Sequence, residues 1–273
     1  MPHQPRPLLD HVTEPATGTQ RLDVGAQVRE RLIQDLKEDK FLLYYQAIVP
    51  ISPSAKGPEL REILVRFKEE EDDLIAPGTF LPILEEHRLM PLLDRWEVAQ
   101  VLKWIRARQA TGARDVPRCS MNLSSDTVRR DAAFGEFVAE GIRRTQAPAP
   151  HLAFELPMAV VLAAPEAVER MTAPLRSAGC TFALNDFTGQ EAGFEIARRL
   201  GIGFVKIDGS IIGRITRDAE AMARVMTIQQ RCRALGMRTI CMQVESAETL
   251  EALRGLDADY VQGFGMEVPR PLK

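Results

Sequence analysis

Polar side chains mark the ends of several apolar, strand-like runs in this 273-residue chain. The run at residues 180–184 ends at Asn185 and Asp186, and burying either side chain without a partner would cost free energy. Comparable positions on other runs are Glu62, Arg66, Asn122, Glu155, Lys206, Asp208, Glu245 and Gln262. Carboxylate and amide oxygens suit Mg²⁺, Mn²⁺ or Ca²⁺ rather than Zn²⁺, and a lysine among them could neutralise a phosphoryl group. The recurrence indicates one functional site rather than scattered surface residues.

These polar groups need a scaffold that brings many strand ends to one place. Strand-like segments are predicted at 41–49, 60–67, 118–123, 151–156, 180–186, 203–208, 238–245 and 259–264, mostly with helical patterns between them. This alternation predicts an α/β fold, and eight units in about 250 residues fit a closed (β/α)₈ TIM-like barrel with its site at the C-terminal ends of the strands. A doubly wound open sheet is the rival interpretation, although no GxGxxG motif follows a strand.

The N-terminal part of the chain departs from regular alternation. A short Pro/Ser/Gly turn at 51–58 links the first two strands, so the first strand is predicted to run antiparallel to the rest. Residues 1–24 contain four prolines and little apolar periodicity, which predicts a disordered or loosely attached arm. A helix is expected from Ala26 to Lys40, and residues 25–273 are expected to form a single barrel domain.

Composition excludes several functional classes. The net charge of −3 gives no general attraction for nucleic-acid polymers or anionic membranes. No apolar stretch approaches the roughly 20 residues of a membrane helix. The four cysteines form no CxxC pair, which suits buried thiols in a reducing cytoplasm. The acidic run at 69–73 is expected to be a solvated loop.

The order of the motifs resembles the EAL domain of bacterial cyclic di-GMP phosphodiesterases, from about Ala26 to the C-terminus. Glu62-Ile63-Leu64 stands at the signature tripeptide of that family, and Arg66 stands at the arginine that follows it. The other segments that carry the resemblance are FLLYYQAIVP at 41–50, MNLS at 121–124, FEL at 154–156, NDF at 185–187, KID at 206–208, CMQVE at 241–245 and QGF at 262–264.

The resemblance implies an EAL-type barrel that holds two divalent ions and, in active members, cleaves cyclic di-GMP to linear pGpG. The metal and water-positioning residues of the family correspond here to Glu62, Asn122, Glu155, Asn185, Asp186, Lys206, Met242 and Glu245, supported by Gln262. The ligand groove that it implies comprises Gln46, Glu62, Leu64, Arg66, Asp208 and Phe264, with Arg66 facing a phosphate.

Two acidic positions of the family are replaced in this chain. Asn185 stands where the family has an aspartate, and Met242 stands where it has a glutamate. Asparagine cannot bridge two ions as a carboxylate does, and a thioether suits Mg²⁺ poorly. At an effective dielectric near 20, unit charges 4 Å apart interact by about 4 kcal/mol. Each lost carboxylate therefore removes an attraction of that order for a nearby ion. We expect no intact catalytic set, residual positions at Lys206, Glu245 and Gln262, and at most one weakly bound Mg²⁺ or Mn²⁺.

The replacements at Asn185 and Met242 leave three candidate functions. The first is a domain that binds cyclic di-GMP without hydrolysing it. The alternative is a regulator that acts on a protein partner independently of the nucleotide. The third is a weak Mg²⁺- or Mn²⁺-dependent phosphodiesterase that produces pGpG. A homodimer is also compatible with the resemblance.

Overall fold

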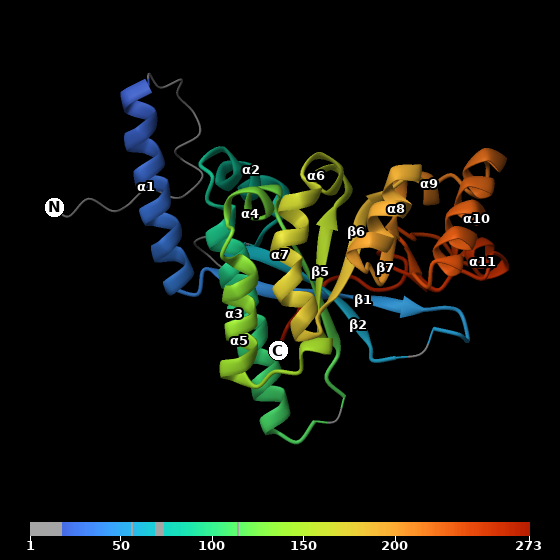
Figure 1. Cartoon of the computed structure of the whole chain (residues 1–273), viewed down its shortest axis with the longest axis horizontal. Coiled ribbons are helices and arrows are strands. Elements are labelled where there is room, and N and C mark those ends of the chain that lie inside the picture. Colours follow the sequence, from blue (N-terminus) through green and yellow to red (C-terminus); the bar gives the residue numbers. More distant parts are fainter. Residues whose placement is uncertain (1–17, 56, 69–73, 114) are drawn as a thin grey trace.

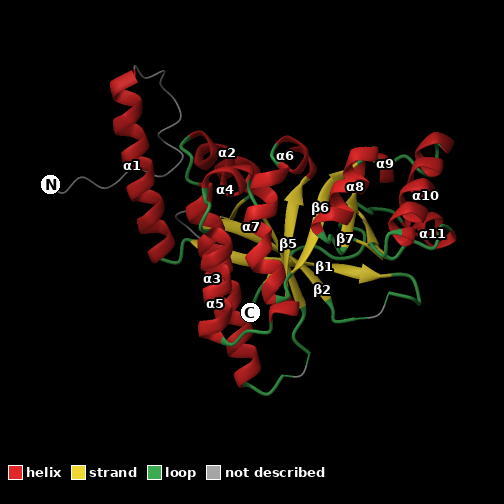
Figure 2. Ribbon diagram, viewed as in Figure 1, coloured by secondary structure: helices red, strands yellow, loops and turns green. Residues whose placement is uncertain are grey.

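The described strands form one sheet that closes into a barrel (Figures 1 and 2). The computed structural model describes residues 18–55, 57–68, 74–113 and 115–273, with side chains from residue 26 onward. The strands of the closed ring are β1 (Phe41–Pro50), β2 (Leu60–Lys68), β4 (Arg118–Asn122), β5 (Leu152–Pro157), β6 (Thr181–Phe187), β7 (Phe204–Ile207), β8 (Arg238–Cys241) and β9 (Tyr260–Val261). Short strands β3 (Leu74–Ile75) and β10 (Arg270–Pro271) extend the sheet beyond this ring. The predicted TIM-like barrel is confirmed.

Strand β1 closes the ring in the predicted orientation. It pairs antiparallel with β2 and with β9, whereas the pairs from β2 through β4 to β9 are parallel. The link from Pro50 to Leu60 is too short for a crossover helix, so the chain has to turn back on itself. The sequence prediction of an antiparallel first strand is therefore confirmed.

Helices surround the barrel and bury its outer face (Figure 2). They are α2 (Pro77–Glu86), α3 (Met90–Ala110), α4 (Ser125–Arg130), α5 (Phe134–Thr145), α6 (Met158–Ala163), α7 (Pro165–Ala178), α8 (Glu191–Leu200), α9 (Gly209–Ile212), α10 (Ala219–Ala234) and α11 (Ala247–Gly255), with a 3₁₀ turn, η3 (Ala149–His151). The aromatic rings of Phe134 and Phe154 meet edge to face between α5 and β5. Burial of such side chains is the main stabilising term for the barrel.

Helix α1 (Gly18–Lys37) lies beside α2, to the left in Figure 1. Val28 and Leu32 of α1 are fully buried in one cluster with Phe80 and Leu84 of α2. The predicted start at Ala26 is wrong, because the helix already begins at Gly18, inside the stretch expected to be an arm. Residues 1–17 and the acidic run at 69–73 lie outside the described residues. The division into arm and domain therefore remains a prediction.

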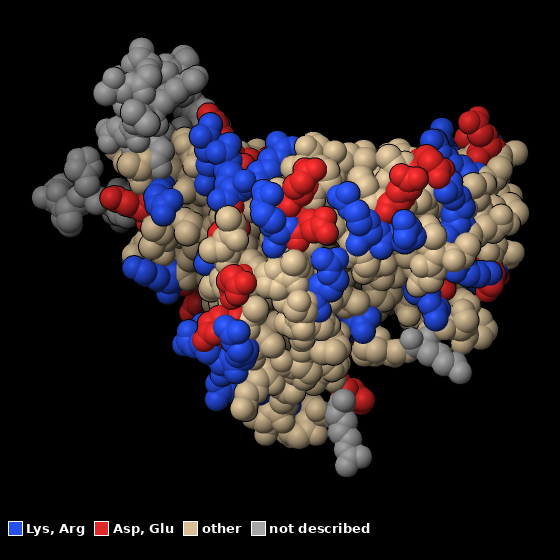
Figure 3. Space-filling view, in the orientation of Figure 1, with Lys and Arg blue, Asp and Glu red and all other residues tan. Residues whose placement is uncertain are grey.

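The distribution of surface charge and the burial of the cysteines agree with what the composition predicts. On the face shown in Figure 3, basic and acidic side chains are interspersed over the helices. No described helix is long and apolar enough to cross a membrane. The four cysteines are free and buried, and burial raises the pKa of the Cys119 and Cys241 thiols to about 12. These thiols are consequently protonated and unreactive at neutral pH.

Asp94 joins α3 to the segment that follows β4. Its Oδ2 accepts hydrogen bonds from the Ser124 amide (3.0 Å), the Ser124 hydroxyl (2.8 Å) and the Thr127 hydroxyl (2.5 Å). Ser124 is the N-cap of α4, because its hydroxyl also accepts from the Thr127 amide at 3.1 Å. Burial raises the pKa of Asp94 to about 6 in spite of these hydrogen bonds, which favour the carboxylate.

The raised pKa of Asp94 makes stability depend on pH. A carboxyl whose pKa is higher in the folded state keeps its proton there, so its contribution to the free energy of unfolding falls as pH rises from about 4 through about 6. Asp94→Asn keeps an acceptor oxygen and does not titrate. We predict that the stability of this variant relative to the unmodified chain rises by about 2 kcal/mol between pH 4 and pH 7. Urea unfolding at each pH measures the difference, and a pH-independent difference would contradict the assignment.

Candidate functional site

One layer of polar side chains fills the barrel interior at the C-terminal ends of the parallel strands. Beneath it lies an apolar interior layer that includes Leu60, Ala183, Phe204, Ile240 and Tyr260. Because side chains alternate across a strand, the next inward position on each strand lies two residues further on. We call the next set the polar layer: Gln46, Glu62, Asn122, Glu155, Asn185, Lys206, Met242 and Gln262. Each strand of the closed ring supplies one of these residues, from its own length or from the segment directly after it.

Lys206 is the centre of the polar layer. Its side chain is 1% exposed, and its Nζ donates to Glu62 Oε2 and to Glu155 Oε2, both at 2.7 Å. Burial lowers the pKa of Lys206, but the two carboxylates outweigh it and hold the pKa above its usual range. Burial and the charge of Glu62 raise the pKa of Glu155, whereas Lys206 and two amides outweigh burial at Glu62 and lower its pKa. One ammonium therefore serves two buried carboxyl groups.

Amide side chains supply further donors to the same carboxyl groups. Asn122 Nδ2 donates to Glu62 Oε1 at 2.8 Å. Asn185 Nδ2 donates to Glu155 Oε2 at 2.8 Å and to Asn122 Oδ1 at 3.0 Å. Asn185 thus presents a hydrogen-bond donor, rather than an oxygen, to its neighbours in the polar layer. Its own Oδ1 and the Oε1 of Glu155 are buried without a hydrogen-bond partner.

Gln262 extends the network to the first strand. Its Nε2 donates to Glu62 Oε2 at 2.7 Å and to Gln46 Oε1 at 3.1 Å. Gln46 Nε2 then donates to the backbone carbonyl of Glu267 at 2.7 Å. The segment after β9 is therefore tied to the polar layer through two amides.

Met242 is the apolar member of the layer. Its partly buried side chain packs against the apolar interior layer. Within the described residues, no group of three or more His, Cys, Asp or Glu side chains is arranged to hold a metal ion. Of the residual metal positions predicted from the sequence, Glu62, Asn122 and Glu155 are brought together in a hydrogen-bonded network centred on a lysine. Asp186 and Glu245 are exposed and lie outside that network.

Asp186 and Asp208 lie at the rim above this layer. Asp186 is exposed and has a positive φ of 55° at the end of β6, a conformation that aspartate tolerates better than most residues. Partial burial and the charge of Asp208 raise its pKa. Asp208 caps α9, since its Oδ1 accepts from the Ser210 amide at 2.8 Å and from the Ser210 hydroxyl. The predicted ligand residue Asp208 therefore also has a structural role.

The remaining predicted ligand residues line the upper part of β2 and the segment after β9. Leu64 and Arg66 follow Glu62 on the same face of β2, and Arg66 lies about 13 Å along the strand from Glu62. The Arg66 guanidinium lies 5.7 Å from the Tyr44 ring, and burial lowers the pKa of Arg66. Phe264 is 66% exposed, which is unusual for an aromatic ring beside a buried polar network. Glu245 is exposed, and the structure gives it no hydrogen bond to the polar layer.

Two carboxyl groups of α3 were missed at the sequence level. Glu97 is 5% exposed and Asp94 is 4% exposed, and both line a cavity of about 280 Å³ beside Asn122. The available signal was helical spacing, because Glu97 falls between the buried Leu93 and Val101 at intervals of four residues. Charged side chains are rarely buried, so a glutamate on the apolar face of a helix indicates a specific role, whereas an exposed glutamate does not.

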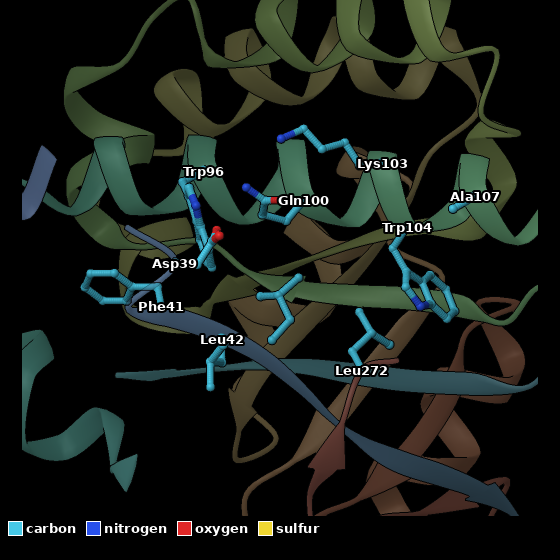
Figure 4. Close-up of a pocket in the computed structure, with 10 residues that line it drawn as sticks. Asp39, Phe41, Leu42, Trp96, Gln100, Lys103, Trp104, Ala107 and Leu272 are labelled. Atoms are coloured by element: carbon cyan, nitrogen blue, oxygen red, sulfur yellow. The ribbon is translucent and has the colours of Figure 1, made fainter. Parts of the chain in front are cut away.

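A larger hollow of about 400 Å³ lies elsewhere, between α3 and β1 (Figure 4). Trp96, Gln100 and Trp104 project from α3 toward β1 at intervals of four residues. Trp104 Nε1 donates to the backbone carbonyl of Lys273 at 2.8 Å. None of the predicted site residues lines this hollow. It is therefore not the candidate site, although it is larger than the cavity beside Asn122.

Comparison with known proteins identifies the family. The EAL domain family matches residues 29–269. The cyclic di-GMP phosphodiesterase PdeB of Shewanella oneidensis is 29% identical over 243 residues, covering 89% of this chain and 28% of that protein. The cyclic di-GMP phosphodiesterase PdeF of Escherichia coli K12 is 30% identical over 242 residues, covering 89% of this chain and 32% of that protein. The chain thus spans about a third of the length of these relatives.

Solved structures agree on the fold. The EAL domain of FimX from Xanthomonas citri, solved in complex with cyclic di-GMP, superposes with a TM-score of 0.81 at 23% identity, covering 93% of this chain and 97% of that one. The PaMucR phosphodiesterase, solved as a cyclic di-GMP complex, gives 0.78 at 25% identity, with coverage of 89% and 96%. The chain therefore belongs to the EAL domain family and is homologous to cyclic di-GMP phosphodiesterases.

Proposed function

We propose that this chain binds cyclic di-GMP and does not hydrolyse it. The observation that carries the proposal is the polar layer, in which Asn185 directs an amide donor at Glu155 and Asn122, and Met242 supplies no oxygen ligand. Family membership and the named activity of the relatives support the ligand class. The hydrogen bonds within the polar layer support the proposal that the nucleotide is not hydrolysed.

A pair of divalent ions does not fit the polar layer. Each carboxylate oxygen has two lone pairs. Both lone pairs of Glu155 Oε2 are used by Lys206 and Asn185, and those of Glu62 Oε2 by Lys206 and Gln262. Two ions about 4 Å apart also need bridging anions to offset their repulsion. Asn185 provides a donor at the position where a bridging carboxylate would be needed, so we assign no catalytic step to metal ions.

The upper groove keeps features that suit a cyclic dinucleotide. Arg66 carries a permanent positive charge and a planar set of donors that match a phosphate. The exposed ring of Phe264 offers a flat apolar face on which a base can stack. Leu64 lies between Arg66 and the polar layer on the same face of β2. These groups do not depend on Asn185 or Met242, so binding can persist where hydrolysis is lost.

Calorimetric titration tests the proposal directly. We predict heat of binding at micromolar cyclic di-GMP, with a dissociation constant that does not change when Mg²⁺ is replaced by EDTA, and no pGpG by chromatography after prolonged incubation. An absence of heat would reject the receptor function and favour a regulator that acts through a protein partner. Accumulation of pGpG with Mg²⁺ or Mn²⁺ would instead establish the weak phosphodiesterase.

Arg66 should carry a large part of the affinity. We predict that Arg66→Ala weakens cyclic di-GMP binding about tenfold or more, because a charge-assisted bond to phosphate is lost. Arg66→Lys should recover only part of the affinity, since an ammonium lacks the planar fork of donors. Arg143→Ala is the matched control, because Arg143 pairs with Glu140 on the exposed face of α5. Equal affinity for Arg66→Ala and the control would place the ligand elsewhere.

Restoring the two family carboxylates should make the fold dependent on metal. Asn185→Asp with Met242→Glu removes the donor to Glu155 and adds two partly buried negative charges to the polar layer. In EDTA we predict a loss of stability on the order of 3 kcal/mol, and recovery of the melting temperature with Mn²⁺ or Mg²⁺. The unmodified chain should show no such response. Activity should return only in part, because Thr188-Gly189-Gln190-Glu191-Ala192 stands where the resemblance implies GTGYS, a stretch that the family uses for catalysis. A metal-dependent melting temperature in the unmodified chain would overturn the account.

A further inference from the structure

The hollow between α3 and β1 is present because β1 has no helix of its own (Figure 4). In a regular barrel of this kind, each strand is followed by a helix that covers its outer face. Here the link from β1 to β2 is too short for a crossover helix, and α1 packs against α2. Strand β10 covers only part of β1, where Pro271 and Arg270 pair with Tyr44 and Tyr45. The remaining space measures about 400 Å³, which is within the range of small-molecule pockets.

Aromatic and aliphatic side chains form the walls of this α3–β1 hollow. Trp96 and Trp104 are eight residues apart on α3, which places them about 12 Å apart along the helix axis. Phe41 and Leu43 of β1 contribute the opposite wall, and Leu272 follows β10 at the side. Aromatic walls of this kind favour a planar ring system, because ring faces and edges pack well against one another.

Trp104 is held in place before any ligand binds. Its Nε1 donates to the backbone carbonyl of Lys273 at 2.8 Å, and the Arg108 guanidinium lies 5.2 Å from the centre of the Trp104 ring. Because its N–H is already used, Trp104 offers only its ring to a ligand. A wall that is fixed in advance loses little conformational freedom on binding, which favours affinity.

The polar groups on the α3 side of the hollow have unused hydrogen-bonding capacity. Trp96 Nε1 is buried and has no hydrogen-bond partner within the described residues. Gln100 and Lys103 make no hydrogen bond or ion pair with any residue that the structure describes. The three donors stand at positions i, i+4 and i+7, so they form a row along one face of α3. A buried donor without a partner is unfavourable, so a ligand with acceptor groups gains hydrogen bonds here.

Charges of opposite sign stand at separate positions in the hollow. Asp39 lies beside Trp96 at one end, whereas Lys103 lies about 10 Å beyond Trp96 along the axis of α3 (Figure 4). An ammonium without a partner attracts a carboxylate, and a carboxylate such as Asp39 accepts a hydrogen bond from a hydroxyl group. The hollow therefore matches a molecule with an anionic group at one end and a hydroxyl at the other.

We propose that the α3–β1 hollow binds a hydroxylated aromatic acid, which is a planar ring system with a carboxylate at one end and a hydroxyl at the other. Lys103 and Gln100 donate to the carboxylate. The hydroxyl accepts from Trp96 Nε1 and donates to Asp39, and the ring lies against Trp104. This site is independent of cyclic di-GMP binding, because no residue of the polar layer or of the predicted ligand groove lines the hollow.

Three related probes test the chemistry of the site: para-coumarate, cinnamate, which lacks the hydroxyl, and para-coumaryl alcohol, which lacks the carboxylate. The chain contains two tryptophans, and both line the hollow, so quenching of tryptophan fluorescence reports on this site. We expect saturable quenching by para-coumarate and about tenfold weaker binding of each probe that lacks one polar group. Calorimetry measures the same dissociation constants without relying on fluorescence.

Three variants assign the contacts. Lys103→Ala should weaken the binding of para-coumarate about tenfold or more and leave that of para-coumaryl alcohol unchanged, since only the acid pairs with the ammonium. Trp96→Phe keeps an aromatic ring but removes the N–H, so it should reduce the advantage of para-coumarate over cinnamate. Arg106→Ala is the matched control, because it removes a positive charge from an exposed position of α3 that does not line the hollow. It should leave all three affinities unchanged.

Other results contradict the inference. If none of the probes binds the unmodified chain, the hollow is not a site for this class of molecule. Equal affinity for para-coumarate and para-coumaryl alcohol would show that the hollow is merely apolar. Unchanged affinity of Lys103→Ala for para-coumarate would place the probe elsewhere. The melting temperature of Lys103→Ala should equal that of the unmodified chain, and if it does not, the order of the three probes on the unmodified chain still decides.

Discussion

The site depends on one buried ion-pair arrangement, in which Lys206 of β7 pairs with Glu62 of β2 and Glu155 of β5 inside the barrel. Two carboxyl groups at this depth repel each other and lose their hydration, so neither could remain there without a cation. Lys206 supplies that cation from the protein itself. The amides of Asn122, Asn185 and Gln262 then complete the network by donating to the same oxygens.

The proposed function requires that an EAL barrel be kept while its metal chemistry is lost. By the resemblance, a site built for two ions has carboxylates at the positions of Asn185 and Met242, whereas here one position supplies an amide donor and the other a thioether. Met242 also supplies no oxygen ligand for a metal ion, because its side chain packs against the apolar layer below. The rim residues Arg66 and Phe264 lie outside the network and keep their capacity for a ligand.

Much of the fold followed from local patterns. The short link after Pro50 determined the direction of β1, and polar residues at the strand ends located the polar layer, because inward positions repeat every two residues. The start of α1 was misplaced, since its first residues lack the apolar spacing on which the prediction relied. The donor role of Asn185 could not be predicted, because it depends on how its side chain meets Glu155 of the neighbouring strand β5. Glu97 was missed because a single carboxyl in a helix is exposed in most proteins.

Diffraction from crystals grown with cyclic di-GMP and Mn²⁺, collected at the manganese edge, tests the central claim most directly. The account predicts an intact cyclic dinucleotide over Leu64, Arg66 and Phe264 and no pair of manganese peaks between Glu62 and Glu155. Two manganese peaks at that position, with a linear product in the groove, would contradict it.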